Sequence, residues 1–233
     1  MKAVLLAAGL GTRLRPLTDA TPKCLVRIGD RALLDIWLDA FEHAGVDHVL
    51  VNTHHLAGQV EEQVARRTGG PEVTLVFEET LRGSAGTLRA ARGFLEDEPF
   101  FLTVNADNLT DFDLRHLIEA HESSGLPATV TAFRAPRPEE CGILAVSDGV
   151  LVGFEEKPRR PRGEVANAGL YAFSPTVLDL VDGPDPVDLG THLLPRLVGR
   201  ARVLDIGTAY LADIGTPQAL AEARSAWREG AQR

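Results

Sequence analysis

The sequence contains little cysteine and no long apolar run, and both shortages exclude classes of protein. Its 233 residues include only Cys24 and Cys141, which are too few and too far apart to predict a disulfide framework or a zinc site. We expect both to be reduced thiols, as in a cytoplasmic protein. No apolar run approaches the length of a membrane-spanning helix. The short apolar run at the N-terminus leads directly into a glycine- and arginine-rich loop, so we expect a buried strand there rather than a signal peptide.

The sequence also contains few lysines, and acidic residues outnumber basic ones. The formal net charge is −9 at pH 7, which argues against a nucleic-acid partner. Only Lys2, Lys23 and Lys157 are lysines, against 21 arginines. Lys23 and Lys157 each lie next to a proline, and a lysine in a chain that otherwise uses arginine indicates a position that needs a compact point charge. A bias in base composition is the alternative explanation of the ratio.

What the sequence does contain is an alternation of apolar segments typical of an α/β domain. Its length is sufficient for one domain with a core of its own. The apolar periodicity predicts strands over residues 3–8, 48–52, 73–77, 100–105 and 128–134, and helices over residues 33–44, 56–67, 85–95 and 114–123. Strands that alternate with helices predict a mostly parallel sheet covered by helices.

The alternation changes after residue 134. Residues 142–146 and 150–155 predict two strands joined by a Ser-Asp-Gly turn, as in a hairpin. Further strands are predicted over residues 168–174 and 203–206, and helices over residues 177–181, 189–197 and 217–228. Ligands bind at the carboxyl ends of the strands in sheets of this kind, so the residues that follow the strands are the candidates for function.

A glycine-rich loop follows the first predicted strand. The segment Gly-Leu-Gly-Thr-Arg-Leu (9–14) lacks the third glycine of a dinucleotide-binding turn, because Leu14 stands in that place, and no Gly-Lys-Ser/Thr follows to make a Walker loop. What remains is a turn whose backbone amides can approach phosphates. Arg13 adds a fork of donors suited to phosphate oxygens. The alternative is a tight turn with surface arginines.

Together with Thr-Pro-Lys (21–23), this loop resembles the signature of the sugar-1-phosphate nucleotidyltransferases, which make NDP-sugars from a nucleoside triphosphate and a sugar 1-phosphate. Compact mannose- and heptose-1-phosphate guanylyltransferases are the members it resembles most. The resemblance implies a Rossmann-like, three-layer α/β/α nucleotidyltransferase fold of the GT-A-like kind. It implies a mixed, mostly parallel central sheet and a small β-hairpin annex that binds the sugar. It further implies one domain over residues 1–233, with a nucleotide-binding half of about 1–110 and a sugar-phosphate-binding half of about 111–233.

The resemblance assigns the nucleotide to two segments. The loop would wrap the triphosphate, with Arg13 and Lys23 as catalytic residues at the reacting phosphates. Gly-Ser-Ala-Gly-Thr-Leu (83–88) resembles the segment beside the base, and its alternative explanation is a helix start capped by Ser84. The implied nucleotide-binding residues are Leu6, Ala8, Gly9, Gly11, Thr12, Arg13, Gly83, Ser84, Gly86 and Thr87.

Four later segments resemble the parts of the family that hold the metal and the sugar phosphate. They are NADN (105–108), GFEEKP (153–158), ANAGLY (166–171) and YLADIGTP (210–217). The resemblance implies that Asp107 and Asp213 bind Mg²⁺, for which two carboxylates and phosphate oxygens are a usual environment. The implied sugar-phosphate-binding residues are Asn105, Gly142, Glu156, Lys157, Asn167 and Gly169, with Glu156 on the sugar hydroxyls and Lys157 on the phosphate. The alternatives are that residues 105–108 form a strand end that binds no metal, and that residues 153–158 form an exposed, charged strand end.

The implied reaction is attack of the sugar-phosphate oxygen on the α-phosphorus, with release of pyrophosphate. The segment at 83–88 favours GTP with a mannose- or heptose-type acceptor, while uridylyl or thymidylyl transfer and a cyclitol or unusual sugar phosphate stay open. A GT-A glycosyltransferase should show Asp-x-Asp where this chain has Asn105, Ala106 and Asp107. A non-catalytic regulatory relative should have lost charged residues of the site, whereas this chain has Arg13, Lys23, Asp107 and Asp213. We expect neither nucleic acid nor a membrane as partner, and a monomer or homodimer.

Several polar residues outside these motifs have simpler expected roles. His54 and His55 follow a predicted strand, and we expect them to have a structural role in the loop there rather than to contact a ligand. Asp111 and Asp113 are expected to cap the helix that follows them. Asp188 is a candidate for holding the sugar, and Cys141 is expected in a turn near the sugar pocket.

Overall fold

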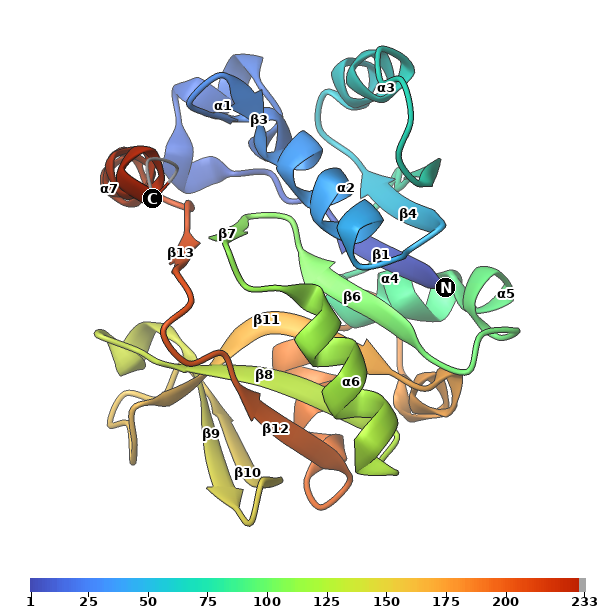
Figure 1. The fold of residues 1–233 in the computed structure, drawn as a ribbon, viewed down its shortest axis with the longest axis vertical. Coiled ribbons are helices and arrows are strands. Elements are labelled where there is room, and N and C mark those ends of the chain that lie inside the picture. Colours follow the sequence, from blue (N-terminus) through green and yellow to red (C-terminus); the bar gives the residue numbers. More distant parts are fainter. Residues whose placement is uncertain (231–233) are drawn as a thin grey trace.

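A nine-stranded mixed sheet forms the centre of the computed structural model, which describes residues 1–230 (Figure 1). The strand order is β5-β4-β1-β6-β11-β8-β12-β10-β9. The strands are β1 Lys2–Leu6, β4 His48–Thr53, β5 Glu72–Phe77, β6 Phe101–Asn105, β8 Ala128–Arg134, β9 Gly142–Ser147, β10 Val150–Glu156, β11 Val165–Phe173 and β12 Ala201–Asp205. Strands β5, β4, β1 and β6 are parallel, as are β8 and β12, while β11 is antiparallel to both β6 and β8. The predicted mixed, mostly parallel sheet is confirmed.

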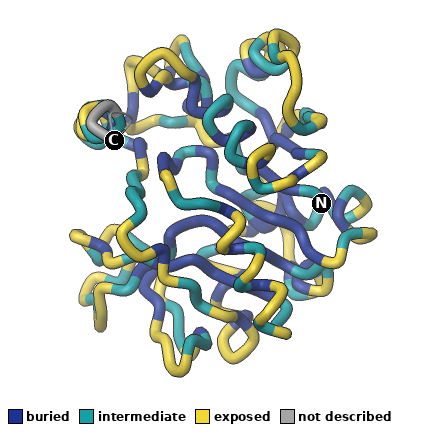
Figure 2. The backbone as a smooth tube through the Cα atoms, in the orientation of Figure 1, coloured by how far each residue is buried: buried dark blue, intermediate teal, exposed yellow. Residues whose placement is uncertain are grey.

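Helices cover both faces of this sheet, which gives three layers. They are α1 Leu17–Ala20, α2 Leu33–His43, α3 Ala57–Ala65, α4 Ser84–Ala90, α5 Arg92–Leu95, α6 Leu114–Ser124 and α7 Pro217–Gly230. Alternate residues of β1 point to opposite faces, so Ala3 and Leu5 join the core under α2, α6 and α7, while Val4 joins the core under α4 and α5. Figure 2 shows the buried residues gathered along the central strands and the exposed residues in the outer loops.

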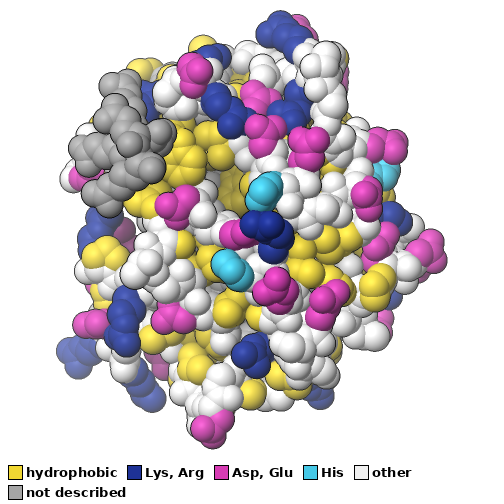
Figure 3. All heavy atoms as spheres, in the orientation of Figure 1, with side chains coloured by type: hydrophobic (Ala, Val, Ile, Leu, Met, Phe, Trp, Pro, Cys, Tyr) yellow, Lys and Arg dark blue, Asp and Glu magenta, His cyan; other side chains and the backbone are white. Residues whose placement is uncertain are grey.

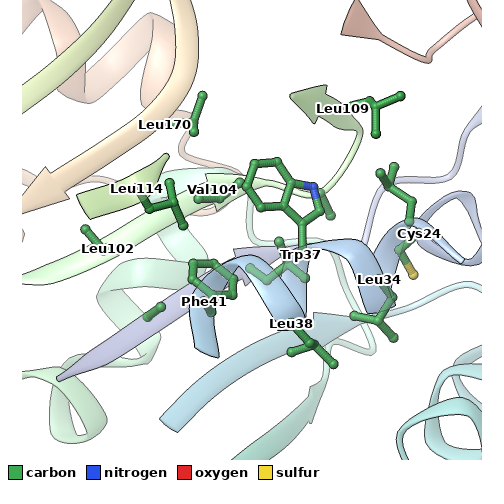
Figure 4. Close-up of a cluster of buried hydrophobic side chains, with 14 of the residues drawn as sticks. Cys24, Leu34, Trp37, Leu38, Phe41, Leu102, Val104, Leu109, Leu114 and Leu170 are labelled. Carbon is green, nitrogen blue, oxygen red and sulfur yellow. The ribbon is translucent and has the colours of Figure 1, made fainter. Parts of the chain in front are cut away.

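The first of these cores is built around α2 (Figure 4). Trp37 and Phe41 from α2 lie over Val104 of β6 and Leu170 of β11. The indole nitrogen of Trp37 also donates a hydrogen bond to the carbonyl of Asn108, at 2.9 Å. Since the indole nitrogen is buried, this bond satisfies its only donor and fixes the backbone that follows β6.

The predicted hairpin is confirmed. β9 and β10 pair antiparallel, and their turn places Asp148 and Gly149 at φ angles of 49° and 74°. A two-residue turn with positive φ at both central positions matches the twist of the two strands, and an Asp-Gly pair tolerates positive φ. The hairpin pairs with the rest of the sheet at two places, Val150 with Arg202 of β12 and Ile143 with Ala166 of β11.

Short elements that the periodicity did not predict connect the larger ones. They are β2 Arg27–Ile28, β3 Arg31–Ala32, β7 Asn108–Thr110, β13 Leu211–Asp213, and 3₁₀ turns at Thr12–Leu14, Lys23–Leu25 and Pro138–Glu140. β7 and β13 pair antiparallel, with Asp213 opposite Asn108. Segments of two or three residues are too short for a periodic pattern, so only the fold reveals this pairing.

The structure corrects several predicted elements. The first strand ends at Leu6 rather than residue 8, and the single helix predicted over 85–95 is interrupted at Ala91, ahead of the helix-weakening Gly93. The helices predicted at 177–181 and 189–197 are instead 3₁₀ and π turns at Pro175–Leu180, Leu189–Leu193 and Leu194–Leu197. Pro195 lies inside the helix predicted over residues 189–197, where it lacks the amide that a continuous α-helix needs.

Of the two expected helix caps, one is confirmed and one is wrong. Asp113 precedes α6 and accepts from the amide of Arg115 at 3.0 Å. Asp111 accepts from the amide of Tyr210 instead, at 2.7 Å, and so ties two distant loops together. Among residues 1–230 no helix combines the length and the apolar character needed to cross a membrane. Figure 3 shows acidic and basic side chains interspersed over one face of the molecule.

Candidate active site

The glycine- and arginine-rich loop after β1 is folded against itself. Gly11 has a φ of +61°, and a Cβ built there would lie 2.8 Å from Cγ2 of Thr18. The hydroxyl of Thr18 donates to the carbonyl of Gly11 at 2.8 Å and closes the loop. A Cβ on Gly9, in contrast, would meet no atom within 4 Å. The loop therefore has one glycine required by its fold and one whose face is open to a ligand.

Four charged side chains converge beside this loop. The ammonium nitrogen of Lys23 lies 2.7 Å from Oδ2 of Asp107 and 3.4 Å from Oδ1 of Asp213. A guanidinium nitrogen of Arg13 lies 3.6 Å from Oδ2 of Asp213. The side chain of Lys23 is only 10% exposed, whereas those of Asp107 and Asp213 are 39% and 54% exposed. The structure thus brings together both predicted catalytic residues and both predicted metal ligands, and leaves the carboxylates open to solvent.

Backbone contacts explain why the two aspartates meet. The pairing of β7 with β13 sets Asp213 beside the residue after Asp107. The amide of Ile214 donates to the carbonyl of Asp107 at 3.0 Å, and the amide of Gly215 donates to Oδ1 of Asp213 at 2.8 Å. Gly215 is a site residue that the sequence reasoning missed: its Cβ would lie 2.7 Å from Nη2 of Arg13. The absence of a side chain there lets Arg13 lie against the backbone.

The donors present fit a hard divalent cation that is shared with a ligand. Two carboxylates face one another across an ammonium group, and residues 1–230 contain no cluster of three or more His, Cys, Asp or Glu side chains that could hold a metal alone. Mg²⁺ is commonly bound by one or two carboxylates, with phosphates and waters completing the shell. Asp107 and Asp213 match that partial set.

The predicted base segment begins α4 and is packed against a distant part of the chain. The amides of Ala85 and Gly86 both donate to the carbonyl of Val187 at 2.9 Å, and the amide of Ser84 donates to Oδ1 of Asp188 at 3.2 Å. The alternative explanation, a helix start capped by Ser84, is therefore wrong: Gly83 is the cap residue, and residues 187 and 188 satisfy the first amides. No sequence signal near 83–88 could have indicated a partner so far along the chain.

The glycines of this segment serve that packing. A Cβ on Gly83 would lie 2.5 Å from the carbonyl oxygen of Val187, and one on Gly86 would lie 2.7 Å from Oδ1 of Asp185. Thr87 is buried, and its hydroxyl donates to Glu78 at 2.5 Å. Gly83, Gly86 and Thr87 thus face protein atoms, while Gly83 and Ser84 are half-buried and residues 85–88 are buried.

The predicted sugar-phosphate residues lie on β6, β9, β10 and β11, except Lys157, which directly follows β10. Gly169 has a φ of +78°, and its Cβ would lie 2.8 Å from Nδ2 of Asn105. Asn167 accepts from the amide of Gly169 at 3.1 Å and donates to the hydroxyl of Tyr171 at 2.6 Å. The absence of a side chain at Gly169 therefore makes room for the amides of Asn105 and Asn108, beside a bulge of β11; Nδ2 of Asn108 lies 2.5 Å from where the Cβ would be.

The carboxylate of Glu156 lies between two glycines. Its Oε2 would be 2.8 Å from a Cβ on Gly142 and 2.6 Å from one on Gly190. Gly190 was missed by the sequence reasoning, because it belongs to none of the recognised motifs. Lys157, the next residue, has a φ of +44° and its side chain is 63% exposed. Its ammonium group lies 3.7 Å from Oε1 of Glu156 and is exposed to solvent, so it is accessible to a ligand.

The remaining candidates have structural contacts. The ring of His54 lies 2.7 Å from the carbonyl of Glu78, and that of His55 lies 2.9 Å from the carbonyl of Thr18, which confirms their expected service to the loops. Burial, followed by the nearby charge of Glu140, raises the pKa of the Cys141 thiol, so it is not a ready nucleophile. Burial raises the pKa of Cys24 to about 12.

A separate cavity of about 600 Å³ opens at the ends of β8 and β12. Phe133, Arg134, Asp205 and Tyr210 are among the residues that line it. None of the predicted site residues does, so the charged cluster around Lys23 is not part of this cavity.

The chain is similar to known proteins along most of its length. The sequence matches the family model described as nucleotidyl transferase over residues 2–230. It is 31% identical over 224 residues to the mannose-1-phosphate guanylyltransferase catalytic subunit beta of Drosophila pseudoobscura pseudoobscura, covering 93% of this chain and 60% of that protein. The same subunit of Dictyostelium discoideum is 31% identical over 225 residues, covering 94% and 62%. The chain thus spans about three fifths of the length of these curated relatives.

A solved structure shows the same fold. HddC from Yersinia pseudotuberculosis, complexed with GMP-PN, superposes with a TM-score of 0.80 at 23% identity. The match covers 97% of this chain and 99% of that one. The three-layer arrangement described above is therefore shared along nearly the whole of both chains.

Proposed function

The chain belongs to the nucleotidyl transferase family, and we propose that it transfers a nucleotidyl group from a nucleoside triphosphate to a sugar 1-phosphate. The observation that carries the proposal is the convergence of Arg13, Lys23, Asp107 and Asp213 beside the folded glycine loop. Phosphoryl-transfer sites combine cationic side chains with carboxylates that hold a metal, because charge neutralisation and positioning supply most of the catalysis. We further propose GTP and a mannose-type 1-phosphate as substrates, since curated relatives are named for that reaction and HddC was solved with GMP-PN.

The chemistry exchanges one phosphorus–oxygen bond for another. A phosphate oxygen of the sugar 1-phosphate attacks the α-phosphorus, and the bond from the α-phosphorus to the bridging oxygen breaks. The β- and γ-phosphates leave together as pyrophosphate. The attacking oxygen is already an anion, so no general base is required. The protein's contribution is to hold the two anions in line and to neutralise their charge.

Three cations are placed for this task. The side chain of Arg13 is 64% exposed, and among the described residues its one carboxylate contact is with Asp213 at 3.6 Å, so its guanidinium is accessible to the leaving pyrophosphate. Lys23 is positioned at the carboxylate pair, next to where the α-phosphate would lie. Lys157 projects from the end of β10 and would hold the phosphate of the incoming sugar.

A divalent cation is expected of this family, and we propose Mg²⁺ held by Asp107 and Asp213. Such an ion supplies charge neutralisation at the phosphates when it is bound. The two carboxylates contribute their orientation, which the pairing of β7 with β13 and the amide of Gly215 fix in advance.

The remaining assignments follow the two halves of the site. The open face of Gly9, the turn at Gly11 and Thr12, and the first residues of α4 would receive the nucleotide. Glu156, wedged between Gly142 and Gly190, would accept hydrogen bonds from sugar hydroxyls. Asn105 and Asn167 complete the sugar side. The two cysteines, both free thiols, support the proposal of a reducing compartment such as the cytoplasm.

Pyrophosphate release tests this function directly. The protein and Mg²⁺ would be mixed with GTP, UTP, dTTP, ATP or CTP, each against a panel of sugar and cyclitol 1-phosphates. We expect release with GTP and mannose 1-phosphate, and only when both are present. Release with UTP or dTTP alone would replace the nucleotide assignment. Nucleotide binding without release on any acceptor would favour a non-catalytic relative, and consumption of an NDP-sugar would favour a glycosyltransferase.

A further inference from the structure

The residue that follows Asp107 contacts three other parts of the fold. Asn108 begins β7 and is 9% exposed. Its carbonyl accepts from the indole nitrogen of Trp37 at 2.9 Å, and its Nδ2 donates to the carbonyl of Ala168 at 2.8 Å. Its backbone pairs with Asp213 across β7 and β13. Asn108 thus connects α2, both carboxylates proposed to hold the cation, and β11, the strand that carries residues assigned to the sugar.

The bond from Trp37 does more than fill the core beneath α2. The indole is 2% exposed, and its N–H is its only hydrogen-bond donor. A buried donor costs free energy unless it has a partner, so a phenylalanine would fill an apolar core more simply. The partner is the first residue of β7, a strand of only three residues. The indole therefore holds this short strand, and with it the pairing to Asp213, against α2.

The side chain of Asn108 makes the second connection, to the strand assigned to the sugar. Ala168 is 1% exposed and lies in the bulge of β11, where pairing with β8 is interrupted between Asn167 and Tyr171. A carbonyl only accepts, so the nitrogen of the Asn108 amide is the atom that faces it. A Cβ on Gly169 would lie 2.5 Å from that nitrogen, so the glycine is required for the contact. A side-chain bond therefore fixes β7 relative to β11.

We propose that Trp37 and Asn108 are positioning residues that hold the two carboxylates at a fixed place relative to β11, a role that rests on the function proposed above. Transfer requires the α-phosphorus and the attacking oxygen to be aligned, and a displacement of about 1 Å can lower a rate roughly 100-fold. Trp37 acts on the carboxylates through the backbone of β7. The amide of Asn108 acts on β11. The two residues therefore control different ends of the same alignment.

The test removes each bond separately. Trp37→Phe removes the indole donor and keeps an aromatic ring, and Asn108→Leu removes the amide and keeps a side chain of similar size. Groups that orient metal ligands typically change metal affinity or activity 10–100-fold, so we expect Mn²⁺ affinity to fall about tenfold in Trp37→Phe. In Asn108→Leu we expect KM for the sugar 1-phosphate to rise about tenfold, with Mn²⁺ affinity within about twofold of the parent protein. Relaxation of water protons by bound Mn²⁺ measures the affinity without nucleotide.

Turnover is expressed per nucleotide-binding site, which calorimetric titration with GTP counts. On that basis kcat should fall about 10–100-fold in both variants. Thr129→Val is the matched control, because it also removes a buried hydrogen bond, the one between the hydroxyl of Thr129 and Nδ1 of His121 at 3.0 Å. Thr129 lies near the amino end of β8, whereas the site lies at the carboxyl ends of the strands. We expect its kcat per site, Mn²⁺ affinity and KM to match those of the parent protein.

These measurements separate positioning from folding. Mn²⁺ affinity in Trp37→Phe equal to that in Thr129→Val would remove Trp37 from the role. An acceptor KM in Asn108→Leu equal to that of the control would remove Asn108. A fall in kcat that disappears when turnover is counted per GTP-binding site would overturn the proposal for both, because it reports only less folded protein.

The parent protein distinguishes this proposal from the function on which it rests. A parent protein that releases no pyrophosphate with any nucleotide and acceptor overturns both. A parent protein that releases pyrophosphate, with Trp37→Phe and Asn108→Leu both matching Thr129→Val, overturns the positioning role alone and leaves the proposed function intact.

Discussion

Removing the ammonium group of Lys23 should raise the affinity of the protein for a divalent cation when no nucleotide is bound. The reason is positional: the ammonium lies 2.7 Å and 3.4 Å from the two carboxylates proposed to hold the metal. A free cation must displace it before both carboxylates can bind. A nucleotide changes the competition, because its phosphates offer the ammonium new partners. Lys23→Met is the suitable change, since it keeps a long apolar stem in a position that is 9% exposed.

The size of the effect follows from exposure. Asp107 and Asp213 are 39% and 54% exposed, so solvent screens each contact with Lys23. Ion pairs of this kind contribute up to about 1 kcal/mol each. Two of them give about 1–2 kcal/mol, and since 1.4 kcal/mol corresponds to a factor of ten, we expect roughly tenfold tighter metal binding. Turnover should move the opposite way and fall on the order of 10²–10³-fold, because a transition-state charge contact is lost.

Electron paramagnetic resonance of Mn²⁺ measures the binding without nucleotide, since the signal of the free ion decreases as the protein binds it. Lys2→Met is the control, because Lys2 pairs with Glu98 at 3.7 Å at the other end of β1. Asp213→Asn in the Lys23→Met background should abolish the gain. Mn²⁺ affinity in Lys23→Met equal to or weaker than that of the parent, with Lys2→Met unchanged, would refute the reasoning.

Three further outcomes follow from local geometry. Gly11→Ala should lower the free energy of unfolding by about 1–2 kcal/mol, because alanine is strained in the left-handed backbone conformation of Gly11. The 2.8 Å approach of the new Cβ to Thr18 should lower it further. Denaturant unfolding measures this change, and a loss smaller than the error of the fit would contradict the prediction. The Arg115 guanidinium beside Asp113 holds the pKa of that carboxyl at about 2, below its ordinary 3.8, so the contribution of Asp113 to stability is present above pH 4 and disappears as the pH falls toward 2. Urea midpoints from pH 7 to pH 2 should therefore fall less steeply for Asp113→Ala, and parallel curves would argue against the pairing. Lys157→Ala should raise KM for the sugar 1-phosphate with KM for GTP unchanged; steady-state kinetics with each substrate varied tests this, and an unchanged acceptor KM removes Lys157 from the site.

The large elements of the fold were predictable because their signals are local. The strand predicted over 128–134 is β8, Ala128–Arg134, and the helix predicted over 33–44 is α2, Leu33–His43. Both have enough residues to show a period, and the turn residues between elements mark where they end. The alternation of such segments was sufficient to predict the sheet and its two covering layers.

Some residues of the candidate site are close in sequence, and others meet only through contacts between distant segments. Arg13 and Lys23 were predictable because one loop carries both. The meeting of Asp107 with Asp213 depends on the three-residue strands β7 and β13, which have no periodic signal of their own. The contact of Gly190 with Glu156 likewise comes from packing between parts distant in sequence. Contacts of this kind follow only from the completed tertiary structure.

One short segment, residues 187–190, links the two proposed substrate sites. Val187 and Asp188 hold the first amides of α4, which lies in the half assigned to the nucleotide. Two residues later, Gly190 makes room for Glu156, which lies in the half assigned to the sugar. Asp188 therefore supports the nucleotide segment, although its sequence position favoured the sugar. The same stretch of backbone therefore contacts one element of each proposed substrate site.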